Sequence, residues 1–253
     1  MGVVNVTPDS FSDGGRFFDP QAAVAHARRL VEDGADLVDI GGESSRPGSA
    51  PVSEEEELSR ILPVLRQVAD LPISIDTRRP RVMKAALDAG ASMINDIEAL
   101  AAPGAAAALA ASGCAVCLMH KKGEPATMQR DPHYDDVVGE VKAFLEERVS
   151  AALAAGIAAE RIVVDPGFGF GKTAAHNLAL LKRLRELSEL PLLVGLSRKS
   201  TLGKLTGRPV EERLAGSLAM ALLALVGGAK ILRVHDVRET RDVVRVWEAY
   251  QQA

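Results

Sequence analysis

The feature that most limits the fold of this 253-residue chain is a regular alternation of short β-branched runs with longer amphipathic segments. Such an alternation is typical of parallel strands joined by crossover helices. Eight strand-like runs are present, at residues 2–6, 37–40, 73–76, 93–96, 115–119, 162–165, 192–196 and 231–234. The helical patterns between and after them begin near Gln21, Ser53, Pro80, Gly104, Tyr134, Ala174, Glu211 and Val237. We therefore predict an α/β fold, a single (β/α)8 TIM barrel that forms one domain over residues 1–253.

The composition fits one large domain and argues against two classes of partner. With 47% hydrophobic residues the chain can bury one core, and its length is near the roughly 250 residues typical of such barrels. The net charge is −4, and basic and acidic residues are mixed along the whole chain. This balance gives no electrostatic reason to expect nucleic acid or a membrane surface as the main partner. Any bound anion must therefore be held by a local cluster.

The most apolar stretch, Leu214–Val226, is interrupted by Gly216 and Ser217 and falls well short of the roughly 20 residues that span a bilayer. The amino terminus lacks the basic region and apolar stretch of a secretory signal. We therefore expect a cytoplasmic enzyme.

Cys114 and Cys117 are the two cysteines of the chain, and their C-x-x-C spacing also occurs in zinc and redox sites. They lie in an apolar run that indicates a strand, where residues three positions apart point to opposite faces. The sequence offers no second pair to complete a metal site. We interpret both thiols as structural.

Polar residues gather at the carboxyl ends of the strand-like runs, which form the active face of a barrel of this kind. For any single one, the alternative is that it only caps the next helix. All eight runs follow the pattern, however, and so many polar groups on one rim cost desolvation free energy that a functional site offsets. The residues at these ends are Asn5, Asp39, Asp76, Asn95, Asp96, Met119, His120, Asp165, Ser197, Lys199, Arg233 and His235.

Two kinds of chemistry can be read from this rim. A basic and small polar group suits a diphosphate, because arginine gives bidentate contacts and imidazole adds a donor; it comprises Asn5, Ser45, Arg46, Arg233 and His235. An acidic and amide group suits a flat heterocycle with several N–H donors along one edge, because carboxylates accept hydrogen bonds and an amide both donates and accepts them. This group comprises Asp76, Asn95 and Asp165.

The glycine-rich stretch at residues 165–173 ends in Gly-Lys-Thr, as a phosphate-binding P-loop does. That motif needs a glycine five residues before Gly171, where Pro166 stands, and the glycines also miss the G-x-G-x-x-G spacing. Nucleotide binding is therefore rejected. We expect the glycines to let the backbone run tightly over the barrel mouth while Phe168 and Phe170 flank an aromatic ligand.

Two charged runs have simpler explanations than a binding site. The acidic run at residues 53–57 is typical of a helix start, with Ser53 and Glu56 as a capping box. Lys121 and Lys122 open a long connection, and we interpret them as a solvated loop tip.

Eight motifs, each at a strand end, together resemble the dihydropteroate synthase family, a family of pterin-binding barrels. They are NVTPDSFSDGG (5–15), GGESSRPG (41–48), SIDT (74–77), IND (94–96), CLMH (117–120), DPGFGFGK (165–172), LSRKS (196–200) and RVHD (233–236). The resemblance runs from the first strand to the last helix. It implies transfer of a 7,8-dihydropterin-6-ylmethyl group from its diphosphate to 4-aminobenzoate, with release of pyrophosphate, in folate biosynthesis.

The resemblance also implies a role for each matching residue. The pterin would be bound by Asp76, Asn95, Ile97, Met119, Asp165, Phe170, Gly195, Lys199 and Arg233. The diphosphate would be bound by Asn5, Ser45, Arg46, Arg233 and His235, and Asn5 would also contact a Mg²⁺ cofactor. The 4-aminobenzoate would be surrounded by Phe11, Ser45, Pro47, Phe170, Lys199 and Ser200. The catalytic residues would be Asp76, Asp165, Lys199 and Arg233.

The chemistry of the residues agrees with these roles. Loss of pyrophosphate leaves positive charge in the dihydropterin, which Asp76 and Asp165 would stabilise. We expect the glycine-, serine- and proline-rich segments at residues 7–18 and 42–51 to close over bound substrate. The apolar Leu214–Val226 segment suggests the face of a homodimer. Two departures from the family pattern are Ser45, where many members have threonine, and a short segment before the first strand.

Two alternatives to this function remain at the level of the sequence. A methyltetrahydrofolate-binding methyltransferase domain shares the barrel and the pterin pocket but needs no diphosphate cluster, so Arg46, Arg233 and His235 argue against it. A non-catalytic pterin-binding paralogue would have lost site residues, and the motifs are intact. Members of the family are sulfonamide targets, which we expect here as well.

Overall fold

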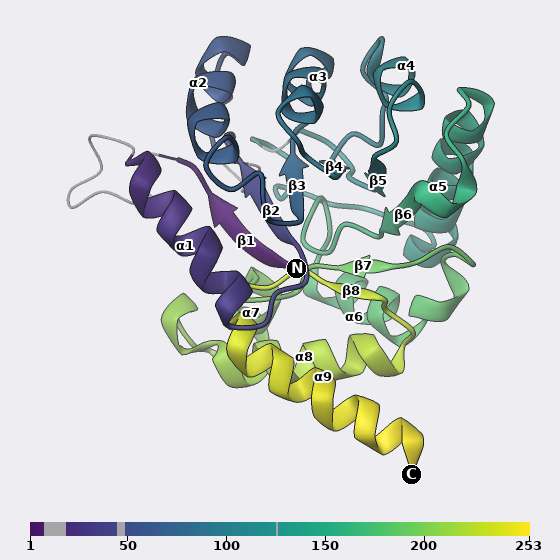
Figure 1. The fold of residues 1–253 in the computed structure, drawn as a ribbon. Coiled ribbons are helices and arrows are strands. Elements are labelled where there is room, and N and C mark those ends of the chain that lie inside the picture. Colours follow the sequence, from purple (N-terminus) through teal and green to yellow (C-terminus); the bar gives the residue numbers. More distant parts are fainter. Residues whose placement is uncertain (8–18, 45–48, 125) are drawn as a thin grey trace.

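A ring of parallel strands forms the centre of the fold in the computed structural model, which describes residues 1–7, 19–44, 49–124 and 126–253 (Figure 1). Within those residues, six strands pair in chain order in one sheet and two more pair with each other. The strands are β1 (Gly2–Asn5), β2 (Val38–Gly41), β3 (Ile73–Asp76), β4 (Met93–Asp96), β5 (Ala115–Met119), β6 (Ile162–Asp165), β7 (Leu193–Val194) and β8 (Ile231–Leu232).

Single bridges join the two sheets at both sides and complete the ring. Val164 of β6 pairs with Leu192, just before β7, and Gly2 of β1 pairs with Val234, two residues after β8. The Val234 N–H also donates to the Met1 carbonyl at 2.9 Å. The predicted α/β barrel is therefore confirmed, and the first and last strands lie side by side.

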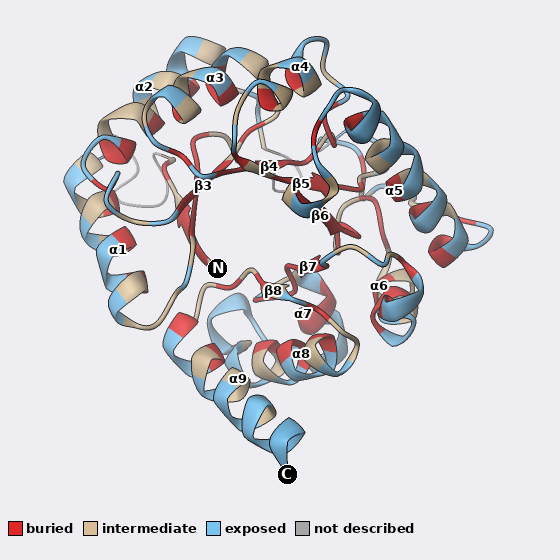
Figure 2. Cartoon of the chain, turned by 45° about the vertical axis from the view of Figure 1, so that its right-hand side comes forward, coloured by how far each residue is buried: buried red, intermediate tan, exposed pale blue. Residues whose placement is uncertain are grey.

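Helices cover the outside of the ring, with their buried residues toward the strands and their exposed residues outward (Figure 2). In the described residues they are α1 (Pro20–Glu32), α2 (Glu54–Leu65), α3 (Pro80–Asp88), α4 (Ala105–Ala110), α5 (Val137–Ala154), α6 (Ala174–Lys182), α7 (Ser200–Thr206), α8 (Leu214–Val226) and α9 (Val237–Gln252). In the part of the chain that the structure describes, none is long and apolar enough to cross a membrane.

Local sequence signals explain where several helices begin and end. Asp19 caps α1 and is followed by Pro20, whose fixed φ suits the first helical position. Ser53 caps α2 through the Glu56 N–H, as predicted, although the Glu56 carboxylate pairs with Arg60. Gly34 ends α1 with a φ of 101°, a left-handed conformation that favours glycine.

The structure corrects some element boundaries. β7 and β8 are shorter than predicted, β2 is displaced by one residue, and α5 begins at Val137 rather than Tyr134. The sequence pattern missed α7, which follows Lys199, and α8 begins at Leu214 after a short 3-10 turn rather than at Glu211. β7, β8 and α7 have too few residues to show a periodic pattern.

Two groups of buried residues form the core. The larger one packs the helices against the outside of the strands and includes Cys114. The smaller one fills the floor of the ring and consists of Met93, Cys117, Val163 and Leu193, with Leu37 and Ile231 against it. Cys114 and Cys117 are both buried and free, and they lie in different clusters, which agrees with a structural role.

The floor cluster determines which residues face the barrel mouth. Residues two positions apart in a strand point to the same face. Two positions beyond the floor residues, that face therefore carries Asp39, Asn95, Met119, Asp165, Gly195 and Arg233. One apolar layer thus supports one layer that is mostly polar.

Candidate active site

Arg233 is the centre of the polar layer. Its Nε donates to Asp39 Oδ2 at 2.7 Å, and its Nη2 donates to Asp76 Oδ2 at 3.0 Å. Asn95 Nδ2 donates to the same Asp39 oxygen at 3.1 Å. The mouth therefore brings together three of the predicted pterin-binding residues through a fourth residue, Asp39.

Asp39 had no assigned role in the sequence analysis beyond its place at a strand end. Its side chain is fully buried, and a buried carboxylate is costly unless it is paired and hydrogen-bonded. It holds both the Arg233 guanidinium and the Asn95 amide. The signal that points to it is its position two residues beyond Leu37, a floor residue.

Burial dominates the electrostatics of the acidic groups. Desolvation raises the pKa of Asp76 to about 7, against the opposing effect of Arg233. Desolvation also raises the pKa of Asp165, while Lys199 acts to lower it. Burial therefore makes the charged form of both carboxylates less favourable than it is in water, and hydrogen bonds from a ligand would offset that cost.

Two cations of the described part of the mouth, Lys199 and Arg233, have pKa values that are shifted in opposite directions. Burial lowers the pKa of Lys199 to about 8, although Asp165 acts to raise it. Burial acts against the charged form of Arg233 too, but Asp39 and Asp76 outweigh it and raise its pKa above the usual value. Arg233 thus stays charged, whereas Lys199 can lose its proton in mildly alkaline solution.

A turn rich in glycine follows β6 and forms one wall of the mouth. The Asp165 carboxylate accepts the Gly167 N–H at 2.7 Å, which fixes the start of the turn. Gly167 has a φ of 66°, and a Cβ there would lie 1.8 Å from the His120 carbonyl oxygen. Only glycine fits this close approach to the connection after β5.

The two phenylalanines of this turn behave differently. The Phe168 side chain is fully buried in the core, so the expectation that it flanks a ligand is wrong. The Phe168 carbonyl instead accepts a hydrogen bond from Lys199 Nζ. Phe170 is half-buried, and Lys199 Nζ lies 4.8 Å from its ring centroid, a cation–π distance. Phe170 is therefore the aromatic residue of the turn that borders Lys199.

Lys172 stabilises the same turn from inside. Its buried Nζ donates to the carbonyl oxygens of Gly167 at 3.0 Å and Phe170 at 3.1 Å, and lies 2.8 Å from His120 Nδ1. Burial lowers the pKa of Lys172 to about 7 and, together with Lys172, that of His120 to about 3. His120 is therefore neutral, and Lys172 of the P-loop-like motif makes its hydrogen bonds within the protein.

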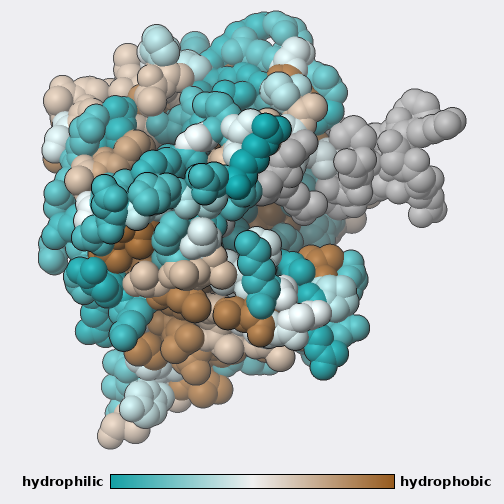
Figure 3. Space-filling model, turned by 180° about the vertical axis from the view of Figure 1, so that it is seen from behind, coloured by the Kyte–Doolittle hydropathy of each residue, from teal (hydrophilic) through white to brown (hydrophobic). Residues whose placement is uncertain are grey.

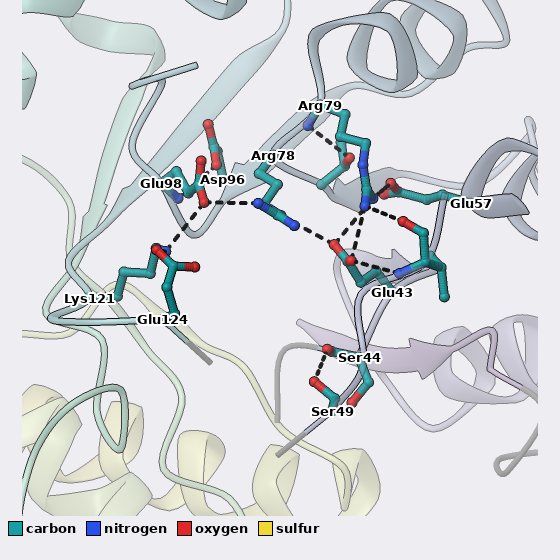
Figure 4. Close-up of polar contacts among 12 residues, drawn as sticks. Glu43, Ser44, Ser49, Glu57, Arg78, Arg79, Asp96, Glu98, Lys121 and Glu124 are labelled. Atoms are coloured by element: carbon teal, nitrogen blue, oxygen red, sulfur yellow. Dashed lines mark hydrogen bonds and ion pairs between the residues drawn. The ribbon is translucent and has the colours of Figure 1, made fainter. Parts of the chain in front are cut away.

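An ion-pair network connects the loops around the mouth (Figure 4). Arg78 pairs with Glu43 at 3.3 Å and with Glu98 at 3.2 Å. Lys121 pairs with Glu98 at 3.3 Å and with Glu124 at 3.5 Å. The connections after β2, β3, β4 and β5 are thereby joined.

This network corrects one prediction and adds residues that the sequence analysis missed. The Lys121 side chain is only 12% exposed, and Lys122 pairs with Glu140 at 2.9 Å. The expectation of a solvated loop tip is therefore wrong for Lys121, whereas Lys122 is exposed as expected. Arg78, Glu43 and Glu98 were missed because their partners lie on different loops, far apart in the sequence.

Three further residues predicted to bind the pterin, Ile97, Met119 and Gly195, lie at or next to the carboxyl ends of strands. Ile97 is buried and lines a cavity of about 250 Å³ together with Arg78. Met119 is buried at the end of β5. At Gly195 a Cβ would lie 3.7 Å from Lys199 Nζ and 3.8 Å from Arg233 Cβ, so the absence of a side chain leaves room between them.

The residues expected to bind the leaving group and the arylamine are described only in part. Asn5 is half-buried at the end of β1, and His235 Nδ1 lies 3.1 Å from Ser197 Oγ. Ser200 is exposed at the start of α7. Phe11, Ser45, Arg46 and Pro47 lie outside the described residues. So do residues 8–18 and 45–48 of the two segments expected to close over substrate.

The described part of the mouth offers few side-chain groups that could bind a metal ion directly. Within the described ranges, no group of three or more His, Cys, Asp or Glu side chains is arranged to hold one. Mg²⁺ usually keeps several waters and binds through few protein groups plus substrate phosphates. The single amide oxygen of Asn5, which is half-buried at the end of β1, fits that pattern.

Comparisons with known proteins agree with this geometry. The family described as "Pterin binding enzyme" matches residues 1–235. Dihydropteroate synthase of Escherichia coli (strain K12) is 51% identical over 254 aligned positions, which cover 98% of this chain and 90% of the relative.

Two solved structures extend the likeness to the fold. Yersinia pestis dihydropteroate synthase with a sulfonamide drug superposes with a TM-score of 0.95 at 48% identity and covers 100% of this chain and 94% of that one. Xanthomonas albilineans dihydropteroate synthase in complex with 7,8-dihydropteroate gives a TM-score of 0.91 at 53% identity, with coverage of 100% and 93%. The chain belongs to the dihydropteroate synthase family of pterin-binding enzymes.

Proposed function

We propose that this protein is a transferase that moves the 7,8-dihydropterin-6-ylmethyl group from its diphosphate to 4-aminobenzoate and releases pyrophosphate. The main support for the proposal is the pair of contacts that Arg233 makes with Asp39 and Asp76 at the mouth of the barrel. Asp165 and Lys199 lie within electrostatic range of it. A relative with 53% identity holds 7,8-dihydropteroate, the product of this transfer.

The acidic and amide residues suit the pterin ring. Asn95 Oδ1 is buried and has no hydrogen-bond partner among the residues that the structure describes. A buried acceptor without a partner is costly, and a ligand N–H would remove that cost. We propose that Asn95, Asp76 and Asp165 bind the N–H edge of the pterin, and that Met119 and Ile97 pack against it.

The charges of the mouth suit a dissociative transfer. The C–O bond between the pterin methylene and the diphosphate breaks, and its electron pair leaves with pyrophosphate. Asp76 and Asp165 then lie where they stabilise the positive charge that spreads into the ring. The arylamine nitrogen forms the new C–N bond and loses a proton. Lys199 and Arg233 complete the proposed catalytic set by holding the ring and the diphosphate.

The leaving diphosphate needs positive charge and hydrogen-bond donors. We propose that Arg233, His235 and Asn5 bind the diphosphate, together with Ser45 and Arg46, which lie outside the described residues. Mg²⁺, held by Asn5 and the diphosphate, would neutralise charge on the leaving oxygen when it is bound. Preorganised electrostatic contacts of this kind make a covalent nucleophile unnecessary.

The arylamine is proposed to lie between the turn after β6 and the start of α7. Phe170 offers an aromatic face, Lys199 an ammonium and Ser200 a hydroxyl. Phe11, Ser45 and Pro47 would complete this site from outside the described residues. Sulfonamides, which a relative with 48% identity binds, would occupy the same place.

We also propose that the protein is a cytoplasmic homodimer of single-domain subunits. Hydrophobic side chains gather in the lower half of the face seen in Figure 3. Leu222, Leu223 and Val226 of α8 are exposed, and a hollow of about 780 Å³ beside them is lined by Leu178 and Leu181. Exposed apolar patches of this kind mark interaction surfaces. Analytical ultracentrifugation tests the proposal. It predicts that the wild type sediments as a dimer and that Leu223→Glu sediments as a monomer.

Pyrophosphate release tests the proposed reaction. The protein is incubated with the dihydropterin diphosphate, 4-aminobenzoate and Mg²⁺, and each component is omitted in turn. The proposal predicts sustained pyrophosphate release over many turnovers only when both substrates and the metal are present. Release at the same rate without the arylamine would indicate a hydrolase, and no release at all would contradict the proposal.

A further inference from the structure

A buried amide bridges two walls of the candidate active site. Asn177 lies in α6 with 3% of its surface exposed. Its Oδ1 accepts the Gly169 N–H at 3.0 Å, and its Nδ2 donates to Thr201 Oγ1 at 2.8 Å. Thr201 is also buried, with 3% exposed. One side chain therefore connects the turn after β6 to the first turn of α7.

Both ends of this bridge lie next to residues with a proposed role. Gly169, whose φ is 82°, stands between Phe168, whose carbonyl binds Lys199, and Phe170, whose ring borders the same ammonium. Thr201 lies two positions after Lys199. The contacts close a loop that runs from Lys199 to the turn, through Asn177, and back through Thr201.

We propose that Asn177 and Thr201 are positioning residues that set the distance between Phe170 and the Lys199–Ser200 segment, and thereby the width of the arylamine site. This inference rests on the proposed function, because the arylamine is placed between those two walls. Hydrogen bonds of fixed geometry suit such a task, since an apolar pair would pack the helices equally well without fixing the register of the turn.

The pterin side of the mouth is held by other contacts. Asp165 is fixed by the Gly167 N–H, and Asn95 by Asp39. Neither contact includes Asn177 or Thr201. Lys199 lies next to the bridge and is also proposed to hold the ring. Loss of the bridge is therefore expected to act mainly on arylamine binding and turnover, with a smaller effect on pterin binding through Lys199.

The test uses variants of matched shape. Thr201→Val removes the hydroxyl and keeps the volume, while Thr201→Ser keeps the hydroxyl. Asn177→Leu removes both hydrogen bonds of the bridge. Thr206→Val serves as the control, because Thr206 lies in the same helix and its hydroxyl binds the Leu202 carbonyl instead. Thermal unfolding establishes that each variant is folded.

Three quantities are measured on each variant: the KM for 4-aminobenzoate, kcat, and the Kd of a non-reactive pterin carboxylate. Because small misplacements near reacting groups have large effects, Thr201→Val and Asn177→Leu are expected to raise the KM for 4-aminobenzoate about tenfold and the pterin Kd by only about twofold. Thr201→Ser and Thr206→Val should stay near the wild type. The variant that combines Thr201→Val with Asn177→Leu should have the same KM and kcat as the more impaired of the two single variants, because each change breaks the same bridge.

Two results would overturn the inference. One is a Thr201→Val variant that cannot be told from Thr201→Ser, and the other is an equal loss of pterin and arylamine binding, which indicates a merely structural role. Direct titration of 4-aminobenzoate in the presence of the pterin carboxylate, pyrophosphate and Mg²⁺ separates this inference from the proposed function. A wild type that binds the arylamine without turnover would contradict only the function, whereas a wild type that does not bind it would contradict both.

Discussion

Arg233 donates from Nε to Oδ2 of Asp39 across 2.7 Å, although the two residues lie 194 positions apart. The pair connects β8 to β2 across the inside of the barrel, and Asp76 accepts a second N–H of the same guanidinium. A buried ion pair of this kind adds little stability by itself, but its loss leaves an uncompensated charge. Its value here is that it fixes the direction of a cation at the mouth.

Arg233→Lys tests whether the fixed orientation of the guanidinium matters for turnover. Lysine keeps the charge but lacks the planar fork that binds two carboxylates at once. We expect kcat to fall by about 10²-fold, the size typical for loss of one preorganised electrostatic contact, while circular dichroism shows an intact fold. Arg245→Lys, on an exposed part of α9, is the control. Unchanged kcat would show that the guanidinium geometry has no part in turnover.

Asp165→Asn tests the pterin side of the mouth. The amide oxygen can still accept the Gly167 N–H, so the turn should keep its shape. The charged acceptor for the ring is lost, and we expect pterin binding to weaken by about 1–3 kcal/mol in a calorimetric titration. Asp135→Asn, at an almost fully exposed position, should have no effect. Equal affinities of the Asp165 variant and the wild type would remove Asp165 from the pocket.

Lys172→Met should change how stability depends on pH. Burial lowers the pKa of Lys172 to about 7 in the folded state, whereas a lysine in the unfolded chain titrates near its ordinary value of 10.5. Between these values the unfolded state binds the additional proton, so the free energy of unfolding rises as pH increases from 7 to 10.5. Below pH 7 the penalty of the buried charge is fully present.

The variant removes this contribution, so its unfolding free energy should rise less steeply over that range in urea unfolding series. The slope should not vanish, because the pKa of Lys199 is also lowered, to about 8. Lys142→Met, at a half-exposed position of α5, is the control. The same slope in Lys172→Met and the wild type would contradict the assignment.

Lys199 should impose an alkaline limit on turnover. Its pKa is lowered to about 8, so the ammonium is present below that pH and is lost above it. Because kcat/KM reports ionisation of the free enzyme, kcat/KM for the pterin diphosphate should fall as pH rises above about 8. Lys199→Arg keeps its charge to a much higher pH and should move the limit beyond pH 10. A limit that stays in place would assign it to another group.

Much of the site could be predicted from the sequence because a barrel imposes two simple rules. Catalytic residues lie at strand ends, and residues two positions apart share a face. Asn95, Asp165 and Arg233 follow both rules, each two positions beyond a floor residue. The sequence alone therefore predicts that these three residues lie together at one mouth.

The rest depends on contacts that no local pattern records. The role of Asp39 depends on an arginine from the last strand, and that of Arg78 on carboxylates from two other loops. Phe168 and Phe170 stand two positions apart in the same motif, yet the left-handed glycines between and around them send one ring into the core and leave the other at the mouth. Turn geometry of this kind is decided by packing against the neighbouring loop.

The central claim, that one mouth joins a pterin to an arylamine as pyrophosphate leaves, is tested most directly by product stoichiometry. In a single turnover with pterin diphosphate, 4-aminobenzoate and Mg²⁺, 7,8-dihydropteroate and pyrophosphate are measured together. We predict equal amounts at equal rates in the wild type, and both slowed to the same extent in Arg233→Lys. Pyrophosphate without dihydropteroate, or neither product, would contradict the account.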